Sequence, residues 1–133
     1  MRFALPRAMA SRNYADLFAW QRAMDLAAVV YDGSKAMPAD ERYGLTAQMR
    51  RAAVSIPANI AEGQGRRTCG EFLNQLSVAY GSLRELETHV LLAQRLRMMD
   101  VATVEGILGN AAEVGRLLNG LANHLESRRR GEP

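Results

Sequence analysis

The sequence predicts an all-α protein, folded as an antiparallel up-down-up-down four-helix bundle. Four long segments carry apolar residues at helical spacing. Only 6% of the residues are aromatic, while alanine, leucine, methionine and arginine are frequent, and this mixture favours helices over sheets. The connections are predicted to be short, at about residues 38–39, 65–67 and 98–99, and short connections join antiparallel neighbours. A chain of 133 residues fits one domain with a single core.

The first helix is predicted to run from Asp16 to Met37. Asn13 or Asp16 is the expected N-cap, and Pro38 is expected to end the helix. Helical spacing assigns the core face to Leu17, Trp20, Met24, Ala27, Ala28 and Tyr31. Three further apolar residues fall outside that face, namely Phe18, Leu26 and Val29.

The second helix is predicted over residues 40–64 and contains Pro57 in its interior. A proline there removes one backbone hydrogen bond and clashes with the preceding turn, so we expect a bend near residues 54–57. Gly63 and Gly65 are expected to terminate the helix. The predicted core face consists of Leu45, Met49, Ala52, Ile56 and Ile60.

The third helix is predicted over residues 68–97. Thr68 followed by Glu71 matches a capping box, in which the two side chains satisfy each other's backbone N–H groups. A heptad-like 4-3-4-3-4 spacing favours the near-parallel packing of helix bundles. The positions with that spacing are Phe72, Leu76, Ala79, Leu83, Leu86 and Val90.

The fourth helix is predicted over residues 100–127, with Asp100 as its N-cap. One apolar stripe consists of Val104, Leu108, Ala111, Leu118, Ala122 and Leu125. Four further residues widen it, namely Ile107, Val114, Leu117 and Leu121. Together they cover about 200° of an ideal helical wheel, although a stripe about 100° wide suffices to face a core. We expect a second subunit to cover the excess.

Three regions follow from this assignment. Residues 1–13 are expected to form a disordered or loosely docked leader, 14–127 the bundle domain, and 128–133 a basic tail. Cys69 is the only cysteine, which excludes an intrachain disulfide and suits a reducing cytoplasm. No stretch approaches the roughly 20 apolar residues of a membrane span, so no membrane partner is predicted.

The charge pattern indicates arginine chemistry without a strong overall field. The net charge is +3, and 16 of the 17 basic residues are arginines. Arginine binds phosphate or carboxylate bidentately, but a mild net charge does not demand a nucleic-acid partner. Two histidines without carboxylates at ligand spacing do not predict a metal site, and no cofactor is expected.

A stripe of polar and small residues lies on the side of the second helix away from its core face. It consists of Arg51, Ser55, Ala58 and Glu62. Arg51 and Glu62 are separated by about 16 Å along the axis, so they do not pair with each other. The stripe is either a solvated face or a seam between subunits, and we favour the seam because Ser55 and Ala58 admit a close neighbour.

Glu87 lies inside the apolar arc of the third helix. A buried carboxylate is costly unless it is paired and hydrogen-bonded. We therefore expect a structural ion pair with Arg50 or Arg51 on the second helix, rather than a catalytic carboxylate.

Arginines also cluster near the expected ends of helices. The run at 63–67, GQGRR, lacks the lysine and hydroxyl residue of a phosphate loop, so a nucleotide site is not predicted. Arg66 and Arg67 nevertheless offer phosphate contacts at a loop tip, and residues 128–130 offer similar contacts.

Arg84 and His89 have the R-x4-H spacing that helical-bundle nucleases of the HEPN type use. Glu85 follows the arginine, where those nucleases usually carry a polar uncharged residue or histidine. The alternative is an exposed His89 without a catalytic role, and we favour this alternative.

Four segments together resemble the bacterial four-helix-bundle proteins known as 23S rRNA-intervening-sequence proteins. The resemblance covers about residues 14–125, and RRAAVSIPANIAEG is its most distinctive run. The segments are FAWQRAMDLA at 18–27, ERYGLTAQMRRAAVSIPANIAEGQGRR at 41–67, EFLNQLSVAYGSLRELETHV at 71–90 and GRLLNGL at 115–121.

A related branch, the accessory variability determinants of diversity-generating retroelements, forms basic pentameric barrels that bind nucleic acid and a reverse transcriptase. The resemblance therefore implies a homopentamer. This chain departs from that branch in its mild charge and its single lysine.

Two functions remain open, both without catalysis. The first is an oligomeric accessory module for nucleic acid or ribonucleoprotein. The second is a homo-oligomeric protein-interaction scaffold. In either case the residues expected to meet the partner are Arg50, Arg51, Arg66 and Arg67.

Overall fold

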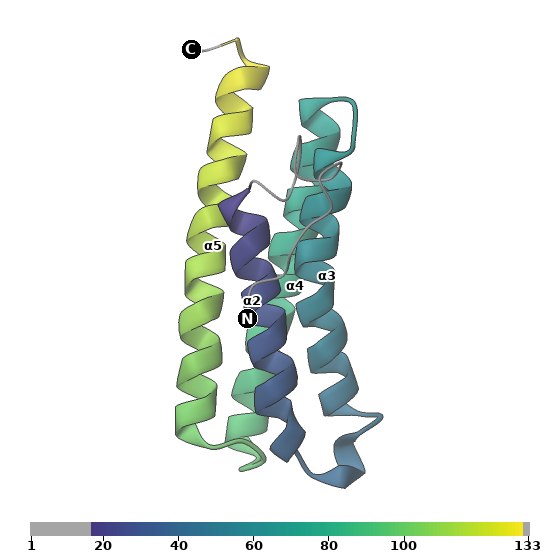
Figure 1. Cartoon of the computed structure of the whole chain (residues 1–133), viewed down its shortest axis with the longest axis vertical. Coiled ribbons are helices and arrows are strands. Elements are labelled where there is room, and N and C mark those ends of the chain that lie inside the picture. The colour runs from purple at the N-terminus through teal and green to yellow at the C-terminus, as the bar shows by residue number, and fades with distance from the viewer. Residues whose placement is uncertain (1–16, 132–133) are drawn as a thin grey trace.

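The computed structural model describes residues 17–131. Over that range the chain forms four long α-helices and no strand, which confirms the all-α class. Figure 1 shows the helices side by side along the long axis of the molecule, with α2 touching α3 and α5, and α4 touching the same two. The helices are α2 Phe18–Gly33, α3 Leu45–Gln64, α4 Cys69–Arg95 and α5 Val101–Arg129. The predicted leader and the proposed caps Asn13 and Asp16 lie outside the described residues.

The connection between α2 and α3 is longer than predicted. The α-helix ends at Gly33 rather than near Met37, and two 3-10 turns follow, η2 Ser34–Ala36 and η3 Ala39–Glu41. A Cβ added to Gly33 would lie 2.8 Å from Cγ2 of Thr103, so the close approach of α5 requires a glycine here.

The predicted core face of α2 was only partly correct, because Leu17, Trp20 and Ala27 are half-buried against the core but none of the six predicted residues is fully buried. Its buried residues are Ala19, Ala23, Leu26 and Val30. In contrast, Met24 and Tyr31 of the predicted face are 41% and 43% exposed. Apolar residues surround most of this helix, so spacing alone fits more than one face. The observed face carries two alanines, which allow α2 to pack closely between its neighbours.

The predicted core face of α3 is confirmed, since all five of its residues are buried. The helix begins at Leu45 instead of Asp40. The Glu41 carboxylate accepts the Leu45 N–H at 2.9 Å, which satisfies one of the free backbone donors at the helix start. The helix continues through Pro57, whose side chain is buried.

The capping box of α4 is confirmed. The Thr68 hydroxyl accepts the Glu71 N–H at 3.1 Å, and the Glu71 carboxylate accepts the Thr68 N–H at 3.3 Å. Five of the six heptad-like positions are buried, and Phe72 is half-buried. The helix ends at Arg95, before a turn in which Arg97 has a φ of 61°.

Asp100 caps α5, as predicted. Its carboxylate accepts the Thr103 N–H at 2.7 Å, and this hydrogen bond lowers the pKa of Asp100. The buried residues are Val104, Ile107, Ala111, Val114, Gly115, Leu118 and Leu125. The excess apolar arc is only partly covered within the chain, because four of its members stay half-buried. These are Leu108, Leu117, Leu121 and Ala122.

Candidate functional site

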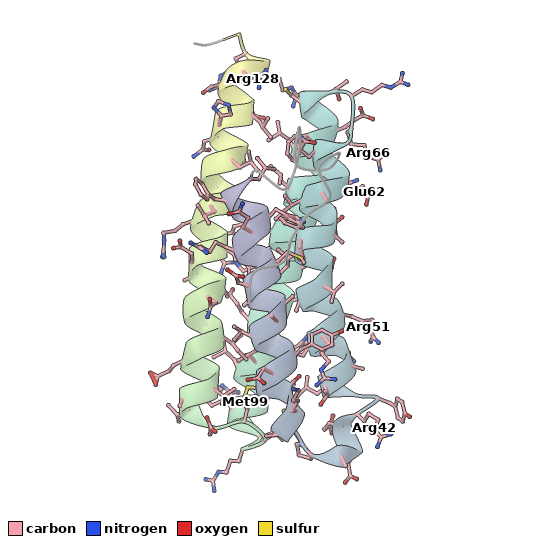
Figure 2. All side chains as sticks on the ribbon, in the orientation of Figure 1. Arg42, Arg51, Glu62, Arg66, Met99 and Arg128 are labelled. Carbon is pink, nitrogen blue, oxygen red and sulfur yellow. The ribbon has the colours of Figure 1, made fainter. Side chains whose placement is uncertain are left out.

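Arginines from two separate elements meet at one end of the bundle. Arg66 and Arg67 lie in the connection between α3 and α4, and Arg128 and Arg129 lie in the last turn of α5. A Cβ added to Gly70 would lie 3.7 Å from Cζ of Arg129, so α5 reaches the first turn of α4. Figure 2 shows Arg66 and Arg128 toward this same end. We call these four arginines the basic end.

The side chains of the basic end make few and weak interactions with other residues. Arg66 pairs with Glu62 at 2.5 Å, and Arg129 lies 3.8 Å from Glu126, with all of these side chains well exposed. Exposed ion pairs contribute little, so they exchange readily for an external anion. Arg67 and Arg128 have neither an ion pair nor a side-chain hydrogen bond with any residue in 17–131.

Arg50 and Arg51 do not belong to the basic end. Thirteen residues separate Arg51 from Gln64, the last residue of α3, which amounts to about 20 Å along the helix axis, and Arg66 follows in the connection. Figure 2 shows Arg51 well below Arg66. The Nε of Arg50 donates to the Ser34 hydroxyl at 2.8 Å, whereas Arg51 is exposed and has no partner among the residues described. The four predicted partner arginines therefore form no single surface.

The four residues of the predicted stripe on the second helix do not share one environment in the structure. Oγ of Ser55 lies 2.9 Å from Oγ of Ser82 on α4, and the Asn59 side chain donates to the same Ser55 hydroxyl at 2.9 Å. Ser55 thus bonds within its own chain. Ala58 and Glu62 are exposed, like Arg51, and the role of these residues as a subunit seam stays a prediction.

Glu87 forms an ion pair, but not with the predicted partner. Nη1 of Arg84 on the same helix donates to the Glu87 carboxylate at 2.7 Å. Nη2 of Arg84 donates to the Tyr80 hydroxyl at 2.6 Å, and its guanidinium lies 4.8 Å from the Tyr80 ring centroid. Glu87 raises the pKa of Arg84. The prediction of Arg50 or Arg51 was wrong, because a partner three residues away on the same helix is already within reach.

The R-x4-H pair is not assembled as a nuclease site. Arg84 is held by Tyr80 and Glu87, while His89 is buried and its Nδ1 has no hydrogen-bond partner. Five helical residues turn through about 500°, which leaves the two side chains roughly 140° apart. The expectation of an exposed His89 was also wrong.

The sequence analysis identified all four arginines of the basic end but did not predict that they lie together. It considered residues 66–67 and 128–130 as separate groups of phosphate contacts. The signal that joins the two groups was present in the predicted topology. In an up-down-up-down bundle, the connection after the second helix and the end of the fourth lie at the same end.

The described part of the chain has neither a cluster of three or more histidine, cysteine or acidic residues able to hold a metal ion, nor a helix able to cross a membrane. Its distinctive chemistry is carried by arginines at the surface of a helical bundle. These features define a class of small all-α domains with arginines at the surface.

The particular family follows from comparison with known proteins. Residues 15–120 match the family model described as 23S rRNA-intervening sequence protein, and the chain belongs to that family. A similar solved structure is that of a protein of unknown function from the S23 ribosomal protein family of Bacteroides thetaiotaomicron. The two share 22% identity with a TM-score of 0.73, over 78% of this chain and 97% of the other, which shows a common fold. None of the curated proteins matches the chain significantly.

Proposed function

We propose that this protein is a non-enzymatic, homo-oligomeric accessory module that binds nucleic acid or a ribonucleoprotein through its basic end. One observation carries the proposal. Arg67 lies in the connection after α3 and Arg128 in the last turn of α5, and neither has a partner among residues 17–131. Arginines at such positions suit phosphate groups, which they bind bidentately. A single free cysteine supports a cytoplasmic location.

The finer architecture is also part of the proposal. We infer an antiparallel up-down-up-down order of the helices, supported by the colour sequence in Figure 1 and by the connection of residues 65–68 between α3 and α4. We also infer a bend in α3 at Pro57, since a proline inside a helix lacks the N–H of the regular pattern.

The half-buried apolar arc of α5 supports self-association. Leu117 and Leu121 lie on this arc, and Gly106 and Gly109 have open space where a side chain would be. Glycine inside an exposed helix is unfavourable by about 1 kcal/mol relative to alanine, so the close approach of another helix would explain both positions. A pentamer and a nucleic-acid partner are what the resemblance of the sequence to the accessory variability determinants of retroelements implies.

The basic end is tested with the double variant Arg66→Ala/Arg67→Ala. We expect it to weaken binding of a single-stranded RNA oligonucleotide and of a DNA duplex. The slope of log affinity against log salt is expected to fall by about 1.4 to 1.8, because two phosphate contacts no longer release counterions. Fluorescence anisotropy at salt concentrations between about 50 and 200 mM measures both effects.

The matched control is Arg22→Ala/Arg116→Ala, which removes the same charge from two exposed arginines on α2 and α5. It is expected to leave the salt slope unchanged. Absent binding in the unmodified protein, or binding independent of salt, would contradict the nucleic-acid function. A homo-oligomeric scaffold with no nucleic-acid role would then be favoured, since Arg51 and Ala58 stay exposed in the single chain.

The oligomer is tested by determining the mass of the intact assembly. A pentamer has about five times the chain mass of 14.7 kDa. Arg51→Glu is expected to dissociate the oligomer by placing a negative charge in the proposed seam, whereas Arg22→Glu on α2 serves as the control. A mass of one chain at all concentrations would refute self-association.

A further inference from the structure

A second basic site lies away from the basic end, at the long connection between α2 and α3. The 3-10 turns η2 and η3 and the start of α3 line an open pocket of about 240 Å³. Its lining includes Lys35, Arg42, Thr46 and Arg50. Figure 2 shows Arg42 toward the end of the bundle opposite Arg128. Lys35 and Arg42 were not among the predicted site residues, because the sequence indicated a connection of two residues here.

The lining is cationic. Three basic side chains face the pocket, and no carboxylate is among the residues that line it. Lys35 has one long ion pair, with Asp32 at 3.7 Å, and both side chains are largely exposed. The guanidinium of Arg42 lies 5.6 Å from the Tyr43 ring centroid and has no acidic partner within the described chain. The pocket therefore favours an anion.

Arg50 is already held in position at this pocket. Its Nε donates to the Ser34 hydroxyl at 2.8 Å, and its guanidinium lies 4.7 Å from the Tyr31 ring centroid. Nη2 of Arg50 donates to the Tyr31 carbonyl at 3.3 Å. All these partners are neutral, so a half-buried positive charge is fixed without a counter-charge. A group fixed before binding loses little entropy when the ligand arrives.

Thr46 supplies an independent observation. It is only 6% exposed, and its hydroxyl has no hydrogen-bond partner. A buried hydroxyl without a partner is unfavourable and calls for an explanation such as a missing ligand. Thr46 also lies in the first turn of α3, where the helix dipole favours negative charge, although the Glu41 carboxylate already accepts the Leu45 N–H there at 2.9 Å.

We propose that this pocket binds a phosphate group. Arg42, Arg50 and Lys35 supply the positive charge, and the Thr46 hydroxyl donates a hydrogen bond to a phosphate oxygen. The site is separate from the basic end and does not depend on the function proposed for that end.

Titration calorimetry with inorganic phosphate, at constant ionic strength maintained with sodium chloride, tests the site. We expect saturable binding that Arg42→Gln and Thr46→Val each weaken by about ten-fold or more, as for a lost hydrogen bond to a charged group. Thr46→Ser keeps the hydroxyl and should retain binding. Arg116→Gln removes an equal charge from a distant position on α5 and should also retain it.

The Thr46→Val variant allows a second measurement, the midpoint of unfolding in the absence of phosphate. Removal of a buried unpaired hydroxyl should raise the unfolding midpoint while it weakens phosphate binding. Phosphate that has no effect beyond that of chloride would overturn the proposal. Binding that survives in both Arg42→Gln and Thr46→Val would overturn it as well.

The source of the phosphate group is distinguished by competition. If a 5′-phosphorylated RNA oligonucleotide displaces phosphate and its 5′-hydroxyl counterpart does not, the pocket binds the end of a nucleic acid. If neither displaces it, the ligand is a small phosphorylated molecule. Either result supports the pocket. Arg66→Ala/Arg67→Ala should leave phosphate binding unchanged, so failure at the basic end is distinguishable from failure here.

Discussion

Replacing Leu26 by alanine is expected to lower the free energy of unfolding by about 2 to 5 kcal/mol, while Met24→Ala should lower it by about 0.5 kcal/mol or less. Leu26 is completely buried on the face of α2 that packs in the core, whereas Met24 is 41% exposed. Truncation of a buried leucine loses the transfer free energy of its methyl groups and leaves a cavity. Denaturant titration of both variants, with slopes compared to the unmodified protein, measures the difference.

Leu26 belongs to the core face of α2 in the structure, and Met24 belongs to the face predicted from spacing. Equal costs for the two variants, or a larger cost for Met24→Ala, would contradict the observed rotation of the helix. Ala28→Ser is a useful further control, because Ala28 belongs to the face predicted from spacing but is exposed in the structure. It should change the stability by only a few tenths of a kcal/mol.

The helices could be predicted where local chemistry was specific. The Thr68 capping box and the Asp100 cap place the starts of α4 and α5, because each side chain bonds a backbone N–H a few residues ahead. The core face of α3 was also predictable, since its opposite side carries polar and charged residues. In α2 the apolar residues surround the helix, so the choice of face depended on tertiary packing that no local signal encodes.

For the candidate sites, the sequence predicted the type of residue involved but not which residues lie together. Arginines were singled out as the side chains expected to bind a partner, but which of them lie together followed only from the fold. Arg50 was expected beside Arg51 at a partner surface, and the structure instead places it over Tyr31 at the α2–α3 connection. That connection was expected to be two residues long. The 3-10 turns that replace it bring Lys35 and Arg42 to the same pocket.

The two basic sites differ in how they would recognise an anion. At the basic end, Arg66 and Arg129 are exposed and make pairs that exchange with solvent, so binding there should depend steeply on salt. At the pocket, Arg50 is half-buried and fixed, and Thr46 is buried. Screening by salt is weaker for buried groups, so phosphate binding at the pocket should be less sensitive to salt. Salt dependence therefore separates the two sites in one unmodified protein.

Gly63→Leu is expected to lower the free energy of unfolding by about 3 kcal/mol or more, and Gly63→Ala by about 1 to 3 kcal/mol. The sequence indicated that Gly63 ends its helix, but the helix continues to Gln64 with Gly65 as the C-cap. The reason for glycine at position 63 is the close approach of α4. A Cβ added there would lie 2.7 Å from Cδ1 of Phe72 and 2.8 Å from Cβ of Gln75. The Phe72 ring has freedom to rotate, but Cβ of Gln75 moves only with the α4 backbone.

The control for Gly63 is Gly106→Ala, at a helical glycine on α5 with open space around the added atom. There the substitution should raise the stability of the single chain by about 0.5 to 1 kcal/mol, because alanine restricts the unfolded chain and fits the helix. The same chemical change thus has opposite signs at the two positions, which thermal unfolding at low protein concentration measures. A stabilised Gly63→Ala would contradict the tight contact between α3 and α4. If Gly106→Ala lowers the stability only at protein concentrations where the oligomer forms, a neighbouring subunit covers the face of α5 that carries Gly106. The proposed assembly requires this result.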